Sequence, residues 1–145
     1  MICYFDTSAF VPVLIDERSS KACRTLWELA DSVVTSRLLY VETVAALARA
    51  KRAGRLEPSQ LEAARRVLDQ LWVEFQVVEL DENLSRSAAD LAVSQSLRGY
   101  DAVHCAAVEL LADDDLVAAS GDRALLAACR SLGVATADVN DPDYL

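Results

Sequence analysis

The chain has 145 residues, of which 53% are hydrophobic, and glycine and proline are scarce. This composition excludes disordered and fibrous proteins and is typical of one globular domain, which we expect to cover residues 1–145. The formal net charge of −9 argues against a nucleic-acid partner bound across the whole surface, so such a contact needs a local basic patch.

Short apolar runs alternate along the chain with longer segments of helical periodicity. The apolar runs predict strands at residues 2–5, 33–35, 75–80, 116–119 and 134–139. The amphipathic segments predict helices at residues 20–30, 37–53, 102–112 and 122–132, with two more that begin at Pro58 and after Asp81. Ser36 is a candidate N-cap for the second of these helices, and Gly54 is a natural residue to end it.

This alternation of strands and helices predicts an α/β fold. We expect a three-layer α/β/α sandwich with a mainly parallel sheet of about five strands. Right-handed crossovers bring the carboxyl ends of parallel strands to the same edge of the sheet, where ligands bind in such folds. Polar residues that follow the predicted strands are therefore the candidates for a functional site.

Four acidic residues that are far apart in the sequence lie where predicted elements begin or end: Asp6, Glu42, Asp101 and Asp122. Asp6 directly follows the first strand and Asp122 follows the fourth, so both reach the carboxyl edge of the sheet. Glu42 lies near the start of a helix among apolar neighbours, where a carboxylate is costly to bury without a partner. Ser120 can hydrogen-bond a neighbouring carboxylate and hold its orientation.

Each of these residues also has a plainer structural explanation. Asp6, Asp101 and Asp122 lie where an Asp commonly caps a helix, and Glu42 alone reads as an exposed helical residue. His104 is the only histidine, and we expect a hydrogen-bonded core residue there rather than a general acid or base.

Taken together, the four acids predict a metal site. Carboxylates without basic partners repel one another by about 1 kcal/mol per close pair in water, and a divalent cation removes that cost. A site made of oxygen ligands selects Mg²⁺ or Mn²⁺ rather than zinc. Such an ion can activate water and stabilise the leaving oxygen of a phosphodiester, so the sequence predicts metal-dependent phosphodiester chemistry.

Four short motifs resemble those of the PIN-domain ribonucleases: Asp6-Thr7-Ser8-Ala9, Leu39-Tyr40-Val41-Glu42, Asp101-Ala102-Val103-His104 and Ser120-Gly121-Asp122-Arg123. They occur in the family's order over essentially the whole chain. The compact length resembles the VapC-type toxins of bacterial toxin–antitoxin pairs. One departure is Ser120, where the family commonly has Thr, but the hydroxyl is retained.

The resemblance implies an Mg²⁺- or Mn²⁺-dependent endoribonuclease that cleaves structured RNA, either tRNA or ribosomal RNA. It implies that Asp6, Glu42, Asp101 and Asp122 form the acidic metal site, with Asp6 and Asp101 as the direct ligands. It also implies a small cognate antitoxin, which wraps the protein and enters its site, and a homodimer.

A basic cluster offers the local positive charge that RNA binding requires. It consists of Arg49, Lys51, Arg52 and Arg55, and a solvated helix face is the alternative explanation for any one of them.

The beginning of the chain predicts a soluble, cytoplasmic protein. It lacks the basic segment that opens a secretory signal, and no apolar run is long enough to span a bilayer, so we expect no membrane partner. The four cysteines are dispersed without a C-x-x-C pair, so we expect buried, reduced thiols rather than zinc ligands or disulfides.

Three other functions remain open. A haloacid-dehalogenase-like phosphatase also has an Asp after its first strand, but it needs a second Asp where this chain has Ser8, and it gives Glu42 no role. A receiver-like interaction module needs an acceptor Asp after the third strand, for which Asp81 is the only candidate. The third alternative is a PIN fold that binds RNA without cleaving it, although four acids beside a polyanion argue for a cation.

Overall fold

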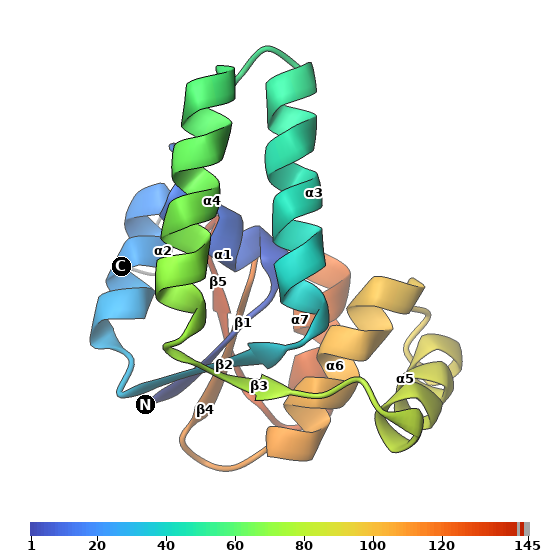
Figure 1. The fold of residues 1–145 in the computed structure, drawn as a ribbon. Coiled ribbons are helices and arrows are strands. Elements are labelled where there is room, and N and C mark those ends of the chain that lie inside the picture. The colour runs from blue at the N-terminus through green and yellow to red at the C-terminus, as the bar shows by residue number, and fades with distance from the viewer. Residues whose placement is uncertain (142, 144–145) are drawn as a thin grey trace.

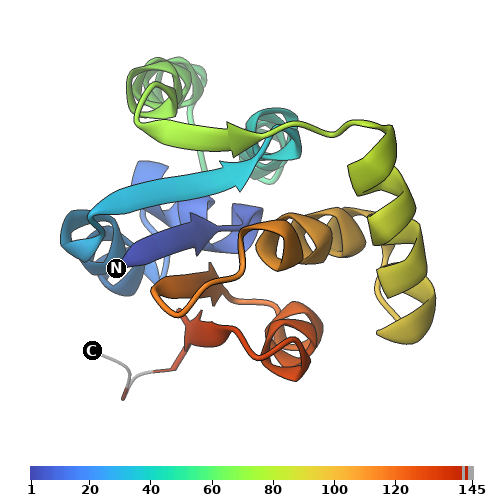
Figure 2. The ribbon, with the colours of Figure 1, turned by 90° about the horizontal axis from the view of Figure 1, so that it is seen from below.

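A sheet of five parallel strands forms the middle layer of the molecule (Figure 1). The computed structural model describes residues 1–141 and residue 143. The strand order is β3-β2-β1-β4-β5, and Figure 2 shows it running from β3 in green to β5 in red. The strands are β1 (Ile2–Phe5), β2 (Ser32–Ser36), β3 (Phe75–Val78), β4 (Leu116–Ser120) and β5 (Ala135–Asp138).

Helices cover both faces of this sheet, as predicted for a three-layer sandwich. One face packs against α1 (Thr7–Leu14), α2 (Ser20–Leu29), α3 (Leu38–Arg52) and α4 (Pro58–Trp72). The other face packs against α6 (Gly99–Leu111) and α7 (Arg123–Ser131), and α5 (Glu82–Ser94) packs against α6. Because both faces are covered, three of the four residues of β1 are buried, and this strand contains no charged residue.

The chain order places a topological switch point at β1. From β1 the chain continues through β2 to β3 on one side, and it returns to the other side for β4 and β5. The register pairs Phe5 of β1 with Ala119 of β4, so the residues that follow these two strands emerge next to each other. In open α/β sheets this crevice is where ligands bind.

The N-cap residues of two helices differ from the sequence prediction. Ser36 is the last residue of β2, and Arg37 is the N-cap residue of α3, although the Ser36 Oγ still accepts a hydrogen bond of 3.2 Å from the Leu38 N–H. Helix α6 begins at Gly99 rather than at residue 102, with Arg98 as its N-cap. Asp101 therefore lies inside the first turn, and the prediction that it caps the helix was wrong.

The strand predicted at residues 75–80 ends early, at Val78. The reason is its neighbour: β2 ends at Ser36, which pairs with Val78, so the next two residues have no strand beside them. The other predicted strands are present within one residue at either end.

Helices α3 and α4 rise side by side away from the sheet (Figure 1). The turn between them contains Gly54, whose φ of 78° lies in the left-handed region that favours glycine, as predicted for a residue that ends a helix. In the part of the chain that the structure describes, every helix is too short or too polar to cross a membrane.

Candidate active site

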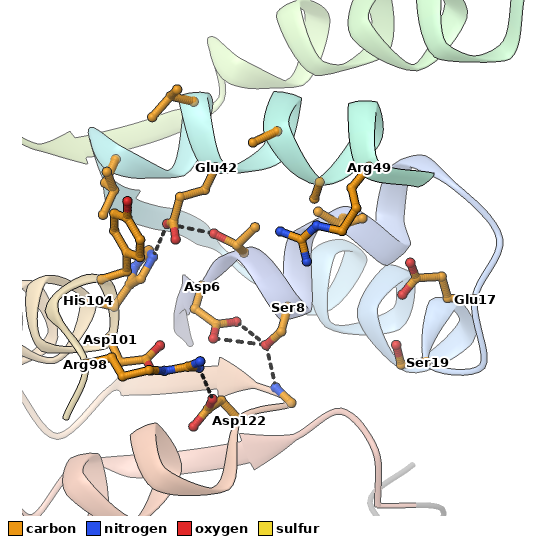
Figure 3. A pocket seen from close by; sticks show the side chains of 18 of the residues that line it. Asp6, Ser8, Glu17, Ser19, Glu42, Arg49, Arg98, Asp101, His104 and Asp122 are labelled. Atoms are coloured by element: carbon orange, nitrogen blue, oxygen red, sulfur yellow. Dashed lines mark hydrogen bonds and ion pairs between the residues drawn. The ribbon is translucent and has the colours of Figure 1, made fainter. Parts of the chain in front are cut away.

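A pocket of about 680 Å³ lies at the carboxyl edge of the sheet, beside the switch point (Figure 3). It is bordered by the starts of α1, α6 and α7 and by one face of α3. The four acids singled out in the sequence, Asp6, Glu42, Asp101 and Asp122, all line it. The fold thus brings together residues from four distant segments of the chain.

Asp6 is the most buried of the four acids, with only 4% of its surface exposed. Its Oδ1 accepts hydrogen bonds from the Ser8 Oγ at 2.7 Å and from the Ala9 N–H at 3.0 Å, so it caps α1. Its Oδ2 accepts a hydrogen bond of 2.6 Å from the Ser120 Oγ. Burial raises the pKa of Asp6, while His104 and these hydrogen bonds act in the opposite direction. The hydrogen bonds to both oxygens hold the Asp6 carboxylate in one orientation.

Ser8 and Ser120 connect α1 to the end of β4. The Ser8 Oγ accepts a hydrogen bond of 2.7 Å from the Gly121 N–H, and the Ser120 Oγ accepts one of 2.9 Å from the Asp122 N–H. A Cβ atom at Gly121 would lie 2.8 Å from the Asn140 Nδ2, so only glycine fits here without a shift. The hydrogen bond expected from Ser120 to a carboxylate is therefore present, and it belongs to a larger network.

Asp101 and Asp122 face a common basic residue, Arg98. The Asp101 Oδ2 lies 3.4 Å from both the Nε and the Nη2 of Arg98, and the Asp122 Oδ2 lies 3.7 Å from that Nη2. The other oxygen of Asp122 caps α7 by accepting a hydrogen bond of 2.9 Å from the Leu125 N–H. Burial and the charge of Asp122 both raise the pKa of Asp101, and Arg98 opposes them.

Glu42 is held by residues that no sequence pattern connects with it. Its Oε1 accepts a hydrogen bond of 2.8 Å from the Thr7 Oγ1 and lies 2.6 Å from the His104 Nε2 (Figure 3). His104 in turn lies 2.7 Å from the Tyr4 hydroxyl through its Nδ1. The expectation that His104 is a hydrogen-bonded core residue is confirmed, but one of its partners is an acid of the pocket.

Only part of the basic cluster lines the pocket. Arg49 and Arg55 line it, whereas the exposed side chains of Lys51 and Arg52 do not. Arg49 follows Glu42 by seven residues, about two helical turns, so both lie on the same face of α3 (Figure 3). Arg55 lies 3.7 Å from Glu17, which also borders the pocket.

Apart from Ser120, the polar residues that hold these acids were not connected with them in the sequence, because none of them has a distinctive pattern. Tyr4 lies within an apolar strand, Thr7 and Ser8 read as a helix start, and Arg98 reads as an exposed loop residue. The one available signal was Ser8, two residues after Asp6, at a spacing where a hydroxyl can return to the capping carboxylate.

The structure does not favour the first two alternatives. Ser8, which replaces the second Asp of a dehalogenase-like phosphatase, donates to Asp6 and leaves that role unfilled. Asp81, the acceptor required of a receiver module, caps α5 by accepting from the Leu84 N–H at 2.8 Å and lies outside the pocket.

Comparison with known proteins gives a consistent picture. A family model described as the PIN domain matches residues 3–144. Ribonuclease VapC45 of Mycobacterium tuberculosis is 40% identical over 130 residues, which are 90% of this chain and 90% of that protein. Two solved structures share the fold. FitAcB from Neisseria gonorrhoeae has a TM-score of 0.70 at 18% identity, covering 96% of this chain and 98% of that chain. VapC20 from Mycobacterium tuberculosis, described as a toxin that cleaves the sarcin–ricin loop, has a TM-score of 0.68 at 21% identity, covering 88% and 95%.

Proposed function

The chain belongs to the PIN-domain family, and on that premise we propose that it is a VapC-type endoribonuclease, the toxin of a bacterial toxin–antitoxin pair. The relationship to a protein named ribonuclease VapC45 supports this activity. The observation that carries the proposal is the convergence of Asp6, Glu42, Asp101 and Asp122 on one pocket. We further propose that residues 1–145 act as a single PIN-like domain in the cytoplasm.

We propose that the pocket binds Mg²⁺ or Mn²⁺, with Asp6 and Asp101 as direct ligands and Glu42 and Asp122 as further acids of the site. In the described residues, no three His, Cys, Asp or Glu side chains form a group that could hold a metal ion by themselves. Mg²⁺ does not need such a group, since it is usually held by one or two carboxylates with water and substrate phosphates. When bound, the ion would activate water and stabilise charge on the leaving oxygen.

The position of Arg98 indicates that positive charge is favourable beside these acids, although Arg98 itself would compete with a bound cation. Its guanidinium group is a positive charge already placed beside both Asp101 and Asp122, although the side chain is 83% exposed. An exposed arginine in this position offsets the repulsion between two carboxylates, which is the electrostatic task of a metal ion. The donor atoms beside it are all carboxylate oxygens, which suit hard ions.

The residues around the acids have positioning roles in this proposal. Ser8, Ser120 and the Ala9 N–H fix the Asp6 carboxylate, so it does not need to be ordered when RNA binds. In the described network both hydrogen bonds to Glu42 reach Oε1, which leaves Oε2 for groups in the pocket. Preorganised carboxylates of this kind lower the reorganisation needed in the transition state.

Arg49 and Arg55 are the residues that we propose to contact RNA phosphates inside the pocket. Both line it, and guanidinium groups bind phosphate oxygens in a bidentate manner. Lys51 and Arg52 lie outside it and would contact only a longer RNA, through nonspecific attraction. The substrate that we propose, structured RNA such as tRNA or ribosomal RNA, follows from the family relationship.

We also propose a small antitoxin as the partner and a homodimer as the assembled form. Two apolar side chains at the pocket, Val41 and Tyr100, are 60% and 66% exposed, which favours a protein partner that covers them. A short upstream gene for a DNA-binding protein would encode the antitoxin. Its product can be co-expressed and co-purified with this chain, and light scattering then measures the mass of the complex and of the chain alone.

RNA cleavage by the purified chain, freed of any partner, tests the proposed function. Total bacterial RNA is incubated with Mg²⁺ or Mn²⁺, and new 5′ ends are mapped for the wild type, for Asp101→Asn and for Asp114→Asn. Asp114 is an exposed acid outside the pocket and serves as the matched control. We expect discrete cleavage sites from the wild type and the control only. Cleavage by Asp101→Asn at the wild-type rate would refute the assignment of the site.

A further inference from the structure

His104 is a buried polar residue to which the sequence assigns no function. It is the only histidine of the chain, and only 2% of its surface is exposed. Both ring nitrogens have a partner: Nδ1 lies 2.7 Å from the Tyr4 hydroxyl, and Nε2 lies 2.6 Å from the Glu42 Oε1. The rings of Tyr4 and His104 meet edge to face, with centroids 5.8 Å apart. Three side chains therefore link the core of the sheet to the pocket.

The partners determine which nitrogen carries the proton. Glu42 offers only acceptor oxygens when ionised, so the Nε2 that faces it must carry the hydrogen. Tyr4 is fully buried, and burial raises the pKa of its hydroxyl well above its usual range, so the hydroxyl keeps its proton and can donate it to Nδ1. Each donor then meets one acceptor, in the order Tyr4 to His104 to Glu42.

The other neutral tautomer does not satisfy this geometry. With the proton on Nδ1, the lone pair of Nε2 would face a carboxylate oxygen at 2.6 Å, which places two acceptors in contact. Leaving a buried polar group without a partner costs about 1–3 kcal/mol. A series of hydrogen bonds in which each group donates to the next avoids that cost.

We propose that His104 is a positioning residue that holds the Glu42 carboxylate against the pocket, with Tyr4 selecting the His104 tautomer that can donate to it; this inference rests on the proposed ribonuclease function. Thr7 donates to the same oxygen of Glu42, so two donors from different segments of the chain fix this side chain. A free Glu side chain loses rotamer entropy when it is ordered, and the network meets that cost during folding instead of at substrate binding. His104 is too buried to contact RNA itself.

A spectroscopic measurement tests the chain of hydrogen bonds without activity. Because the protein has one histidine, its imidazole ¹⁵N resonances need no assignment to a residue, and their couplings to the ring hydrogens Hδ2 and Hε1 distinguish Nδ1 from Nε2. For the metal-free wild type we expect a protonated Nε2 and an unprotonated Nδ1, and we expect Tyr4→Phe to weaken this preference. A protonated Nδ1 in the wild type would overturn the proposal.

A matched pair of substitutions tests the positioning role. In His104→Gln the amide nitrogen reaches the place of Nε2 and can donate to Glu42, whereas the shorter side chain of His104→Asn reaches only the place of Nδ1. We expect kcat to fall about threefold or less for Gln and about tenfold or more for Asn, as for the loss of a hydrogen bond to a charged group, with KM for RNA unchanged. Equal losses of kcat would show a purely structural role.

Control measurements separate the possible failures. Melting temperatures of both variants show whether they fold, and if neither folds, the ¹⁵N measurement on the wild type decides. If the wild type itself cleaves no RNA, the proposed function is wrong. The tautomer of His104 can still be measured in that case, and it alone decides whether the hydrogen-bond chain exists.

Discussion

Asp6 and Ser120 are separated by 114 residues in sequence, yet a hydrogen bond of 2.6 Å joins the Ser120 Oγ to the Asp6 Oδ2. The sheet register explains the contact: Phe5 pairs with Ala119, so the next residue of each strand leaves the sheet beside the other. The same hydroxyl accepts the Asp122 N–H at 2.9 Å. One buried serine thus orients Asp6 and fixes the backbone that leads into Asp122.

Replacing Ser120 tests this arrangement. Ser120→Ala removes the donor to Asp6 and the acceptor for the Asp122 N–H, so we expect the free energy of unfolding to fall by about 1–3 kcal/mol and RNA cleavage to slow. Ser120→Thr keeps the hydroxyl and is the matched control, for which we expect cleavage within a few fold of the wild type. Urea denaturation and a single-turnover cleavage assay measure the two effects. Identical cleavage by Ala and Thr variants would contradict the orienting role.

Removing Arg98 should strengthen cation binding. Its guanidinium lies beside Asp101 and Asp122, so an incoming divalent ion meets a like charge there. We expect Arg98→Ala to lower the Kd for Mn²⁺ about three- to tenfold at low ionic strength, since a charge a few ångströms away contributes about 1 kcal/mol in water. Arg86→Ala is the control, because Arg86 is an exposed arginine paired with Glu82 outside the pocket. An unchanged or higher Kd in Arg98→Ala would show that Arg98 does not compete with the ion.

Arg49 should contribute to the affinity for RNA rather than to the chemical step. It lines the pocket on the same face of α3 as Glu42, so its loss should remove one phosphate contact. We expect Arg49→Ala to raise KM for RNA with little change in kcat, and to reduce the slope of log affinity against log salt by about 0.7–0.9. Arg86→Ala again supplies the control for loss of one positive charge. A salt slope equal to that of the wild type would exclude a phosphate contact at Arg49.

Stability of the metal-free protein should depend on pH through Asp6. Burial raises the pKa of this carboxyl, so the folded state holds its proton to a higher pH than the unfolded state. The protonated Asp6 carboxyl therefore contributes stability that is fully present below the pKa of the unfolded state, near 3.8. This contribution is lost as the pH rises through the pKa of the folded state. Asp6→Asn has no proton to lose, so we expect its melting temperature in EDTA to exceed that of the wild type increasingly as pH rises from about 4. A difference in melting temperature between the two proteins that stays constant across this pH range would disprove the effect.

The sequence predicts the sheet and the acids because both depend on local patterns. Apolar runs such as β1 and a carboxylate after the strand, such as Asp6, are visible without a structure. The strand predicted at residues 75–80 was too long because its true end depends on where β2 stops, which is a property of pairing and not of composition. The start of α6 was misplaced because the Gly99-Tyr100 pair reads as a turn but adopts helical geometry.

The network that holds the acids could not be predicted in the same way. Thr7 and His104 reach Glu42, and Tyr4 reaches His104, across more than 30 positions of sequence, so their relation follows from tertiary packing alone. Arg98 shows the same limit, since its position between two carboxylates depends on how α6 and α7 pack together.

Calorimetric titration with Mn²⁺ tests most directly whether the acidic pocket is a metal site. We expect saturable binding to the wild type and to Asp114→Asn, and a Kd raised about tenfold or more in Asp6→Asn and Asp101→Asn, because each loses one of the proposed ligands. The same ion should raise the melting temperature of the wild type and not that of the two pocket variants. No saturable binding by the wild type at millimolar Mn²⁺, or equal binding by Asp6→Asn, would contradict the account.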